Sequence, residues 1–536
     1  MSVVSLDISP DNPIRKSDLD GVLTKLDQKL KPEEETDYLT LLQAIHGPAQ
    51  IVLDLPEYGP TTDLERFPRT DVHLPNSGDN THGSWAWKFT AKDKDENLGF
   101  LTGKTIIYKD NISVASVECM LGTDVFTGWQ PTVDATVVTR SLEAGATAIG
   151  KAVCENMSLS ASSFSAKTGP VHNPYAEGYS AAGSSSGCGV LVALGEADLA
   201  IGGDQGGSVR LPASWCGLYG LKPTFGLVPY TGIASLEPTI DHTGPMTRTC
   251  LDNALLLRAI AGRDKFDDRS YAAPYPEDIP DYPAILGSVR GRPRPLEGFK
   301  VGMLKEGFEV CDRGGANDSR VGAKVKEAAK KFEEAGATVE WISIPMHSVA
   351  PSLWATIARM GCIPALWGGT AGRTGYHMND LTKNMQNTKT EEGWEKMYCA
   401  QKNMILNGTY LWSTHPDLYG KAMNQVHHLR AQYDEALSRF DVLVTPTTPF
   451  LPNRHPSPNA SVLDKMSKSM GQTLNTCPFN ISGHPALSMP IGMLESLDNS
   501  TLQFPVGMQI VAKHFDESTI YKAAFSWEEL HNWKEL

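Results

Sequence analysis

Two glycine clusters that carry serine hydroxyls are the segments of this sequence most able to do chemistry. The first, AGSSSG, spans residues 182–187, and the second, GGDQGGSVRLP, spans residues 202–212. The run CGVLVALGEADLAI between them is as apolar as a buried helix and strand, so neither cluster is a linker. Gly206 and Gly207 permit a close approach of the backbone to a ligand, and consecutive N–H groups there could converge on an anion.

Such a glycine turn has two functional interpretations, a phosphate-binding nest or an oxyanion hole beside a nucleophile. Neither GxxxxGK[ST] nor GxGxxG occurs in this segment, which disfavours the phosphate interpretation. The oxyanion interpretation needs a nucleophile, and Ser208 directly follows the two glycines. The residues therefore favour acyl transfer through a serine.

A serine hydroxyl becomes a good nucleophile only when a base takes its proton. The nearest histidines, His172 and His242, stand in no catalytic motif, and we interpret both as structural hydrogen-bonding residues. Lys109 ends the strand-like run IIY, where a lysine is usually an exposed edge charge. A buried lysine with a lowered pKa could act as the base, and the residues alone leave both interpretations open.

The composition favours an acidic, soluble, cytoplasmic enzyme. The formal net charge of -14 over 536 residues, with no long basic run, argues against a nucleic-acid partner. The nine cysteines are scattered without a CxxC pair, so we expect no disulfide framework and no zinc knot, and Cys188 and Cys216 read as small buried residues. The N-terminus lacks a signal-peptide pattern, and we find no apolar run long enough for a membrane span.

Secondary-structure patterns predict an α/β fold. Residues 17–45 show the apolar spacing of two helices, with Ser17 as the N-cap of the first, and residues 56–98 read as a long surface connector. From residue 101 short β-rich runs alternate with helical segments, and the order strand, helix, strand recurs over residues 300–345. Residues 350–435 are helical and rich in tryptophan, either core packing or a pocket wall, and a buried strand follows in DVLVTPTTPFLP.

Four segments together resemble the amidase signature family of serine hydrolases: GKTIIYKDNI, AGSSSG, GGDQGGSVRLPASWCGLYGLKPT and PVGMQIVA. The similarity covers roughly residues 75–530 and looks closest to the nitrile-hydratase-linked amidases and the fungal amidases and urethanases. It implies a large mixed β-sheet covered by helices on both faces. We expect an N-terminal helical extension at 1–75, a core in two parts at 76–345 and 441–536, and a helical insert at 346–440 that shapes the substrate pocket.

The resemblance implies a catalytic triad of serine, cis-serine and lysine. It assigns Ser208 as the nucleophile, Ser184 rather than Ser185 as the bridging serine, and Lys109 as the base. Ser186 departs from the family pattern, in which many members carry glycine.

The resemblance also assigns supporting groups around the nucleophile. The oxyanion hole would consist of the backbone N–H groups of Gln205, Gly206, Gly207 and Ser208. Asp204 and Arg210 would brace this loop, the alternative being a partly exposed salt bridge of small energetic value. The segment MSLSASSFS, residues 157–165, corresponds loosely to the lining of the family's substrate channel.

The resulting functional prediction is hydrolysis of small carboxamides to carboxylic acid and ammonia, with no cofactor and no metal. The same triad would serve a urethanase that cleaves ethyl carbamate. More remote alternatives are a glutamine amidotransferase subunit, which usually has a threonine-type residue in place of Gln205, and a non-enzymatic phosphate-binding module. We expect a small amide or carbamate as the partner, no nucleic acid and no membrane, and the N-terminal helices either pack on the main domain or form a homodimer contact.

Overall fold

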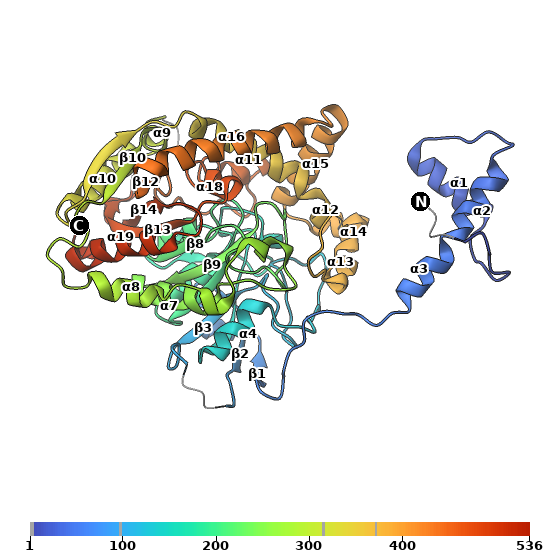
Figure 1. Cartoon of the computed structure of the whole chain (residues 1–536), viewed down its shortest axis with the longest axis horizontal. Helices are drawn as coiled ribbons and strands as arrows, with labels where there is room; N and C mark the ends of the chain where they lie inside the picture. The colour runs from blue at the N-terminus through green and yellow to red at the C-terminus, as the bar shows by residue number, and fades with distance from the viewer. Residues whose placement is uncertain (1–4, 96–98, 314–316, 370–371) are drawn as a thin grey trace. The chain divides into compact units, whose positions relative to one another are not determined.

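The computed structural model describes residues 5–95, 99–313, 317–369 and 372–536, and it divides into two compact units, Met1–Gly59 and Pro60–Leu536. The first unit holds the helices α1 (Lys16–Leu26), α2 (Glu35–Ala44) and α3 (His46–Leu53) (Figure 1). The two predicted helices are present, and α3 was not predicted. Ser17 is not the N-cap of α1: Arg15 holds that position, and the carboxylate of Asp18 accepts a hydrogen bond from its N–H at 2.7 Å.

The second unit is built on a mixed β-sheet, which has twelve strands within the described ranges. Their order is β1-β2-β4-β3-β7-β9-β8-β13-β14-β12-β10-β11. The strands are β1 (Arg69–His73), β2 (Trp85–Ala91), β3 (Thr105–Lys109), β4 (Thr147–Ala152), β7 (Leu199–Asp204), β8 (Tyr219–Lys222), β9 (His242–Thr247), β10 (Lys300–Leu304), β11 (Thr338–Ile342), β12 (Val442–Pro446), β13 (Ala486–Glu495) and β14 (Gln503–Val511). The prediction of a long surface connector over residues 56–98 therefore missed two strands, because β1 and β2 lie within this segment and pair antiparallel.

Helices cover both faces of this sheet, because side chains of its buried strands alternate between two apolar cores. Ile106 and Tyr108 of β3 join one core and Ile107 joins the other. The first core packs against α4 (Thr136–Glu143), α7 (Cys250–Ile260), α8 (Tyr282–Val289), α10 (Ser319–Lys330) and α19 (Glu517–Leu530). The opposite face is covered by α5 (Ser186–Ala193), α6 (Arg210–Cys216) and α18 (Cys477–Ser482), and by α11 (Met346–Gly361) and α16 (Leu418–Arg439), which pack against each other. The predicted α/β architecture is thus confirmed.

The segment predicted as a helical insert holds α11, α12 (Ile363–Leu366), α13 (Asn379–Met385), α14 (Glu391–Lys396), α15 (Cys399–Thr414) and α16. These helices stand together in the orange part of the chain (Figure 1). The stretch Met346–Leu366 is long and apolar enough to cross a membrane by length and composition, which corrects the expectation that no such run exists. Core helices of soluble proteins can have the same length and composition. In this structure α11 packs against α15, α16 and α18, as a core helix does.

The topology brings the chemically interesting loops to one edge of the sheet. Strands β3 and β7 are parallel neighbours, so their carboxyl ends lie side by side. Lys109 is the last residue of β3, and Asp204 is the last residue of β7. Open α/β sheets bind their ligands at such edges, beyond the carboxyl ends of the strands.

Candidate active site

Lys109 is fully buried at the end of β3, so it is not an exposed edge charge. Its Nζ atom lies 2.7 Å from Ser184 Oγ and 3.4 Å from the backbone oxygen of Gly203. Burial lowers the pKa of this lysine, and weaker interactions with acidic groups nearby, Asp204 among them, oppose that shift. An amine whose charged form is disfavoured can accept a proton from a hydroxyl that it already contacts.

Ser184 follows a cis peptide bond, which joins it to Gly183. The side chain of Ser184 is fully buried, and its backbone oxygen accepts a hydrogen bond from the Glu155 N–H at 3.1 Å. Position 183 requires glycine, because a Cβ atom there would lie 2.0 Å from the backbone oxygen of Ser162. The turn therefore holds the Ser184 hydroxyl in one place against Lys109.

The other two serines of this cluster have different partners. The Ser185 hydroxyl lies 3.2 Å from the backbone oxygen and 3.3 Å from the backbone nitrogen of Gly203. The Ser186 hydroxyl donates to Glu155 Oε1 at 2.8 Å. Ser184 is therefore the serine of the three whose hydroxyl contacts Lys109.

Ser208 lies in the turn between β7 and α6 and is partly exposed. Its backbone oxygen accepts a hydrogen bond from the Ser185 N–H at 3.3 Å, which joins the two glycine turns. The hydroxyls of Ser184 and Ser208 share no hydrogen bond in the part of the chain that the structure describes. The structure thus brings Lys109 and Ser184 into contact and places the backbone of Ser208 against the same turn.

The turn before Ser208 is organised around the carboxylate of Asp204. Asp204 Oδ1 accepts a hydrogen bond from the Gly207 N–H at 2.8 Å, and Oδ2 accepts one from the Val209 N–H at 3.1 Å. Gly207 has a φ of 135°, which an L side chain rarely adopts. Because the Gly207 N–H already has this partner, the oxyanion prediction narrows to Gln205, Gly206 and Ser208.

Asp204 and Arg210 form a buried ion pair with 2.9 Å between Oδ1 and Nη2, and both side chains are inaccessible to solvent. Burial by itself would raise the pKa of Asp204, but the charge of Arg210 and several hydrogen bonds hold it well below its usual range. The guanidinium also donates to the Thr476 backbone oxygen, to Gln509 Oε1 and to Asn480 Oδ1, at 2.7 to 2.9 Å. The pair ties the turn to α18 and β14, so the interpretation as a partly exposed bridge does not hold.

The sequence did not assign to the site three residues that lie around these turns: Trp354, Tyr230 and Glu155. Trp354 of α11 donates from its indole Nε1 to the Gln205 backbone oxygen at 2.7 Å, and the Gln205 amide donates to the Tyr230 hydroxyl at 2.7 Å. A Cβ atom on Gly206 would lie 2.6 Å from Trp354 Cζ2, so the indole covers the glycine turn closely. The high tryptophan content of the insert was the only sequence signal for Trp354.

Glu155 is the third of these residues, and it is fully buried behind Ser184. One carboxylate oxygen accepts hydrogen bonds from the Ser165 N–H at 2.7 Å and the Ser165 hydroxyl at 2.5 Å, and the other accepts from Ser186. Burial raises the pKa of this carboxyl to about 7. The three hydrogen bonds oppose this rise, because they favour the charged carboxylate. Ser186, the departure from the family pattern, therefore has a structural role as a donor to Glu155.

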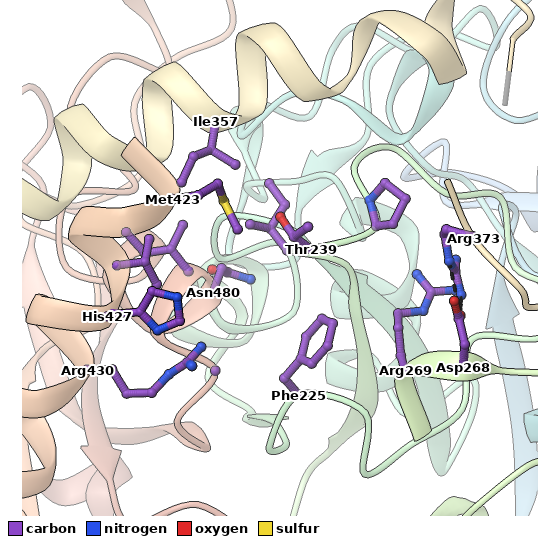
Figure 2. A pocket seen from close by; sticks show the side chains of 15 residues that line it. Phe225, Thr239, Asp268, Arg269, Ile357, Arg373, Met423, His427, Arg430 and Asn480 are labelled. Carbon is purple, nitrogen blue, oxygen red and sulfur yellow. Dashed lines mark hydrogen bonds and ion pairs between the residues drawn. The ribbon is translucent and has the colours of Figure 1, made fainter. Parts of the chain in front are cut away.

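Two cavities beside this region are bordered by the helical insert. One of about 500 Å³ is lined by Tyr230, which contacts Gln205, and by insert residues that include Met360 and Trp412. Another of about 430 Å³ is lined by Asn480, which contacts Asp204 and Arg210. Figure 2 shows Arg269, Arg373 and Asp268 together on one side of it and His427 and Arg430 on the other.

Both volumes are in the range of small-molecule sites. Lys109, Ser184 and Ser208 line neither cavity in the described structure. The 500 Å³ cavity reaches the glycine turn through Tyr230 and Gln205, which makes it the better candidate for the acyl pocket.

The two histidines and two cysteines that the sequence analysis interpreted as structural lie outside the Lys109–Ser184 contact. His242 is buried, and its Nδ1 lies 2.8 Å from the Ile240 backbone oxygen, while His172 Nδ1 accepts a hydrogen bond from the Gly178 N–H. Cys188 and Cys216 are buried free thiols whose pKa is raised by burial. None of the four contacts the Lys109–Ser184 pair through a hydrogen bond in the described ranges.

Comparison with known proteins identifies the family. The sequence profile of the family named Amidase matches residues 82–521, which is most of the chain. The chain belongs to the amidase signature family. The predicted family and fold are therefore confirmed, and the relatives support an amidohydrolase.

Relatives from within the family include several kinds of enzyme. The chain is 38% identical over 446 residues to an enantioselective amidase of Rhodococcus rhodochrous, covering 82% of each chain. It is 32% identical to one subunit of the glutamyl-tRNA(Gln) amidotransferase of Moorella thermoacetica, covering 82% of this chain and 85% of the relative. The solved peptide amidase of Stenotrophomonas maltophilia superposes with a TM-score of 0.63 at 27% identity, covering 81% of this chain and 83% of that one.

Proposed function

We propose that this protein is a serine amidohydrolase that cleaves the C–N bond of small carboxamides through an acyl-enzyme on Ser208. The observation that carries the proposal is the buried contact of 2.7 Å between Lys109 Nζ and Ser184 Oγ. It supplies a base and a proton relay in the turn that adjoins Ser208. Membership of the amidase family and the 38% identity to an enantioselective amidase support the same reaction class.

The proposed reaction begins with a proton transfer along the relay. Neutral Lys109 takes the proton of Ser184 while Ser184 takes that of Ser208, and the Ser208 oxygen attacks the amide carbonyl. The oxyanion is stabilised by backbone N–H groups of the glycine turn. Gln205, Gly206 and Ser208 are the candidates, because none of these N–H groups donates to a protein acceptor in the described structure.

The relay then runs in reverse to release the amine. Ser184 gives a proton to the leaving nitrogen and recovers one from Lys109, so ammonia departs as the C–N bond breaks. Water attacks the remaining ester with its proton taken by the same relay, and the carboxylic acid leaves with Ser208 restored. Each proton that the relay accepts is returned within the cycle, so these residues complete it.

Ethyl carbamate is a second candidate substrate, since the same attack on a carbonyl cleaves it. A third candidate is glutamine, because the chain is 32% identical to the glutamyl-tRNA(Gln) amidotransferase subunit. The phosphate-nest alternative is disfavoured by the buried carboxylate of Asp204, which already occupies the Gly207 and Val209 N–H groups and would repel a phosphate.

The experiment that tests the proposal measures ammonia release from aliphatic amides, aromatic amides, ethyl carbamate and glutamine, and aniline release from anilides. Ser208→Ala and Lys109→Ala are the test variants, and Cys188→Ala, a buried thiol outside the relay, is the matched control. We expect turnover of carboxamides by the parent and the control and none by the two test variants. Preferred turnover of ethyl carbamate or glutamine would reassign the substrate, and full activity of Ser208→Ala would refute the mechanism.

Two further proposals concern the whole chain. The first unit leaves a set of apolar side chains largely exposed: Leu26, Leu41, Ile51, Val52 and Leu53. These side chains fit either predicted role of the N-terminal helices, packing on the main domain or a homodimer contact. Sedimentation of the full chain and of a chain beginning at Pro60 distinguishes the two. A cytoplasmic location without a nucleic-acid or membrane partner also remains our proposal.

A further inference from the structure

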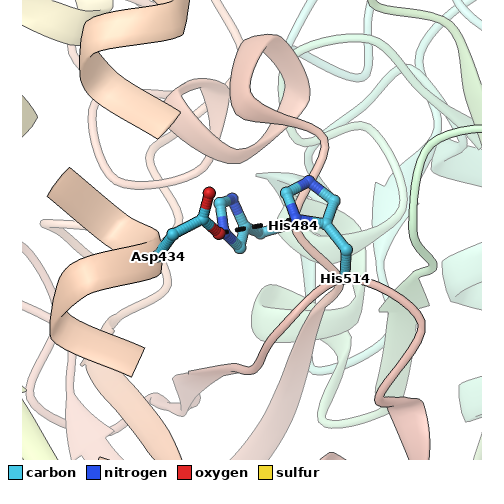
Figure 3. A group of neighbouring side chains, drawn as sticks. All are labelled: Asp434, His484 and His514. Atoms are coloured by element: carbon cyan, nitrogen blue, oxygen red, sulfur yellow. Dashed lines mark hydrogen bonds and ion pairs between the residues drawn. The ribbon is translucent and has the colours of Figure 1, made fainter. Parts of the chain in front are cut away.

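Three side chains from separate segments converge at one place that the proposed reaction does not use. Asp434 lies on α16, His484 lies between α18 and β13, and His514 lies between β14 and α19 (Figure 3). Asp434 Oδ1 is 3.0 Å from His484 Nε2 and 3.7 Å from His514 Nδ1. One ligand atom from each residue lies within 4.8 Å of the other two.

The hydrogen bonds of His514 fix which of its ring nitrogens carries the proton. Its Nε2 lies 3.1 Å from the Ser482 backbone oxygen, and a carbonyl oxygen can only accept, so Nε2 is the protonated nitrogen. A neutral imidazole carries one proton, so in the neutral ring Nδ1 has none. In that ring Nδ1 carries a lone pair, and its contact with the Asp434 carboxylate lacks a proton. A cation between them would satisfy both groups.

His484 can present a lone pair to the same point. Without an ion, its Nε2–H donates to Asp434 Oδ1 at 3.0 Å. An ion would take the place of that proton, and the ring would then carry its proton on Nδ1, 3.1 Å from the Ser482 hydroxyl, which can accept it. The ring is fully buried. Ser482 thus holds the outer nitrogen of both rings, as outer partners of metal-bound histidines do.

We propose that Asp434, His484 and His514 bind one divalent transition-metal ion of the Zn²⁺ type. Two imidazole nitrogens and one carboxylate suit zinc and its neighbours better than calcium or magnesium, which prefer all-oxygen sites. Bonds of about 2.0 to 2.1 Å to a tetrahedral ion place neighbouring ligand atoms about 3.3 Å apart. The separations of 3.0 and 3.7 Å from Asp434 lie on either side of this value, and the ligand atoms of the two histidines lie within 4.8 Å of each other, so side-chain rotations would close the set.

The surroundings set the access and the strength of this site. The Asp434 side chain is 53% exposed and that of His514 is 26% exposed, so an ion can enter from solvent, and water would complete the coordination. Arg430 donates to the Ser482 backbone oxygen at 2.9 Å, and its positive charge weakens cation binding. Burial lowers the pKa of the neighbouring Lys222 well below its usual value, which limits a second positive charge.

A bound ion would tie three parts of the second unit together. It would link α16 to the segments that precede β13 and follow β14. Because α16 packs against α11, which carries Trp354 onto the glycine turn, the ion would stabilise the wall of the proposed active site. The cysteine pattern predicted no zinc site, and this one uses histidines 30 residues apart that stand in no motif.

Calorimetric titration of the full-length, chelator-treated protein with ZnCl₂ near neutral pH tests the proposal. We expect one equivalent to bind and the melting temperature to rise. His514→Gln should weaken binding more than about 100-fold, and Ser482→Ala by about 10 to 100-fold, the range for outer partners. His428→Gln, which removes an exposed histidine of α16, should bind zinc as the parent does. Far-UV circular dichroism verifies that each variant is folded.

If the parent binds zinc no better than His514→Gln does, the proposal is overturned. His514 would then carry a second proton, on the Nδ1 that faces Asp434, and NMR spectra would show an imidazolium. Cobalt supplies an independent readout. Bound Co²⁺ should show ligand-field bands without a thiolate charge-transfer band. A thiolate band would contradict the proposal, because it would place the ion on a cysteine such as Cys399, the one cysteine among the described residues that is not buried. Neither readout requires amidase activity, so the result is independent of the proposed function.

Discussion

The buried pair of Asp204 and Arg210 allows a stability prediction of known size. Asp204→Asn keeps the shape of the side chain and removes its charge. In the parent, Oδ2 accepts from the Val209 N–H, the Arg210 N–H and the Arg210 Nε, so an amide nitrogen at that position would face three donors. Breaking a buried ion pair on one side costs about 3 to 5 kcal/mol, because the other charge is left uncompensated.

Urea denaturation of the parent and the variant, followed by tryptophan fluorescence, measures this loss. Glu392→Gln is the matched control, since it neutralises the carboxylate of an exposed pair with Lys396, and we expect its denaturation midpoint to stay unchanged. The double variant Asp204→Asn/Arg210→Met should lose less than the sum of the two single variants, because it leaves no charge unpaired.

The pH dependence of the same difference follows from the lowered pKa of Asp204. A carboxyl whose pKa is lower in the folded state stabilises the protein above its unfolded pKa of about 3.9 and loses this contribution as the pH falls further. The parent should therefore approach the stability of Asp204→Asn below about pH 4. A loss under about 1 kcal/mol at neutral pH, well short of the range for breaking a buried pair, would refute the argument.

Two other variants probe the glycine turns. Gly206→Ala should lower kcat on the order of 100-fold, the usual effect of losing one oxyanion donor, because its Cβ would lie 2.6 Å from Trp354 Cζ2 and displace the turn. The control is Gly287→Ala, at an exposed glycine of α8 with open space around it and helical backbone angles. An unchanged kcat in Gly206→Ala would place the oxyanion hole elsewhere. Glu155→Gln should flatten the dependence of stability on pH. The parent carboxyl has its pKa raised from 4.5 to about 7, so between these pH values it keeps a proton that the unfolded chain has lost. The parent therefore loses stability as the pH rises from 4.5 to about 7. Urea midpoints across that range measure the difference, and parallel curves would show that Glu155 does not titrate there.

Local sequence patterns predicted the parts of the fold that depend on neighbouring residues. The alternation of strands and helices, the buried strand at β12 and the two glycine turns all follow from short-range periodicity and composition. The strands β1 and β2 were missed because the segment around them is rich in proline, glycine and aspartate, and pairing with β4 stabilises β2 there. Tertiary pairing outweighed local propensity at that edge of the sheet.

Several features of the candidate site could not be predicted from the sequence. A lysine at the end of a strand could be exposed or buried, and what decides is that β3 lies between β4 and β7 in the sheet. The contact of Trp354 with Gln205 joins residues 149 positions apart, and no spacing rule reaches that far. Ser186 differs from the family pattern without a visible reason in the sequence, and Glu155 supplies one in three dimensions.

The central claim is that buried Lys109 activates Ser208 through Ser184. Labelling with a fluorophosphonate, followed by intact-mass analysis and peptide mapping, tests it most directly. One adduct should form on Ser208 in the parent, and its rate of formation should fall by about 100-fold or more in Lys109→Ala, the usual contribution of a general base. An adduct on any other residue, or labelling of Lys109→Ala at the parent's rate, would contradict the account.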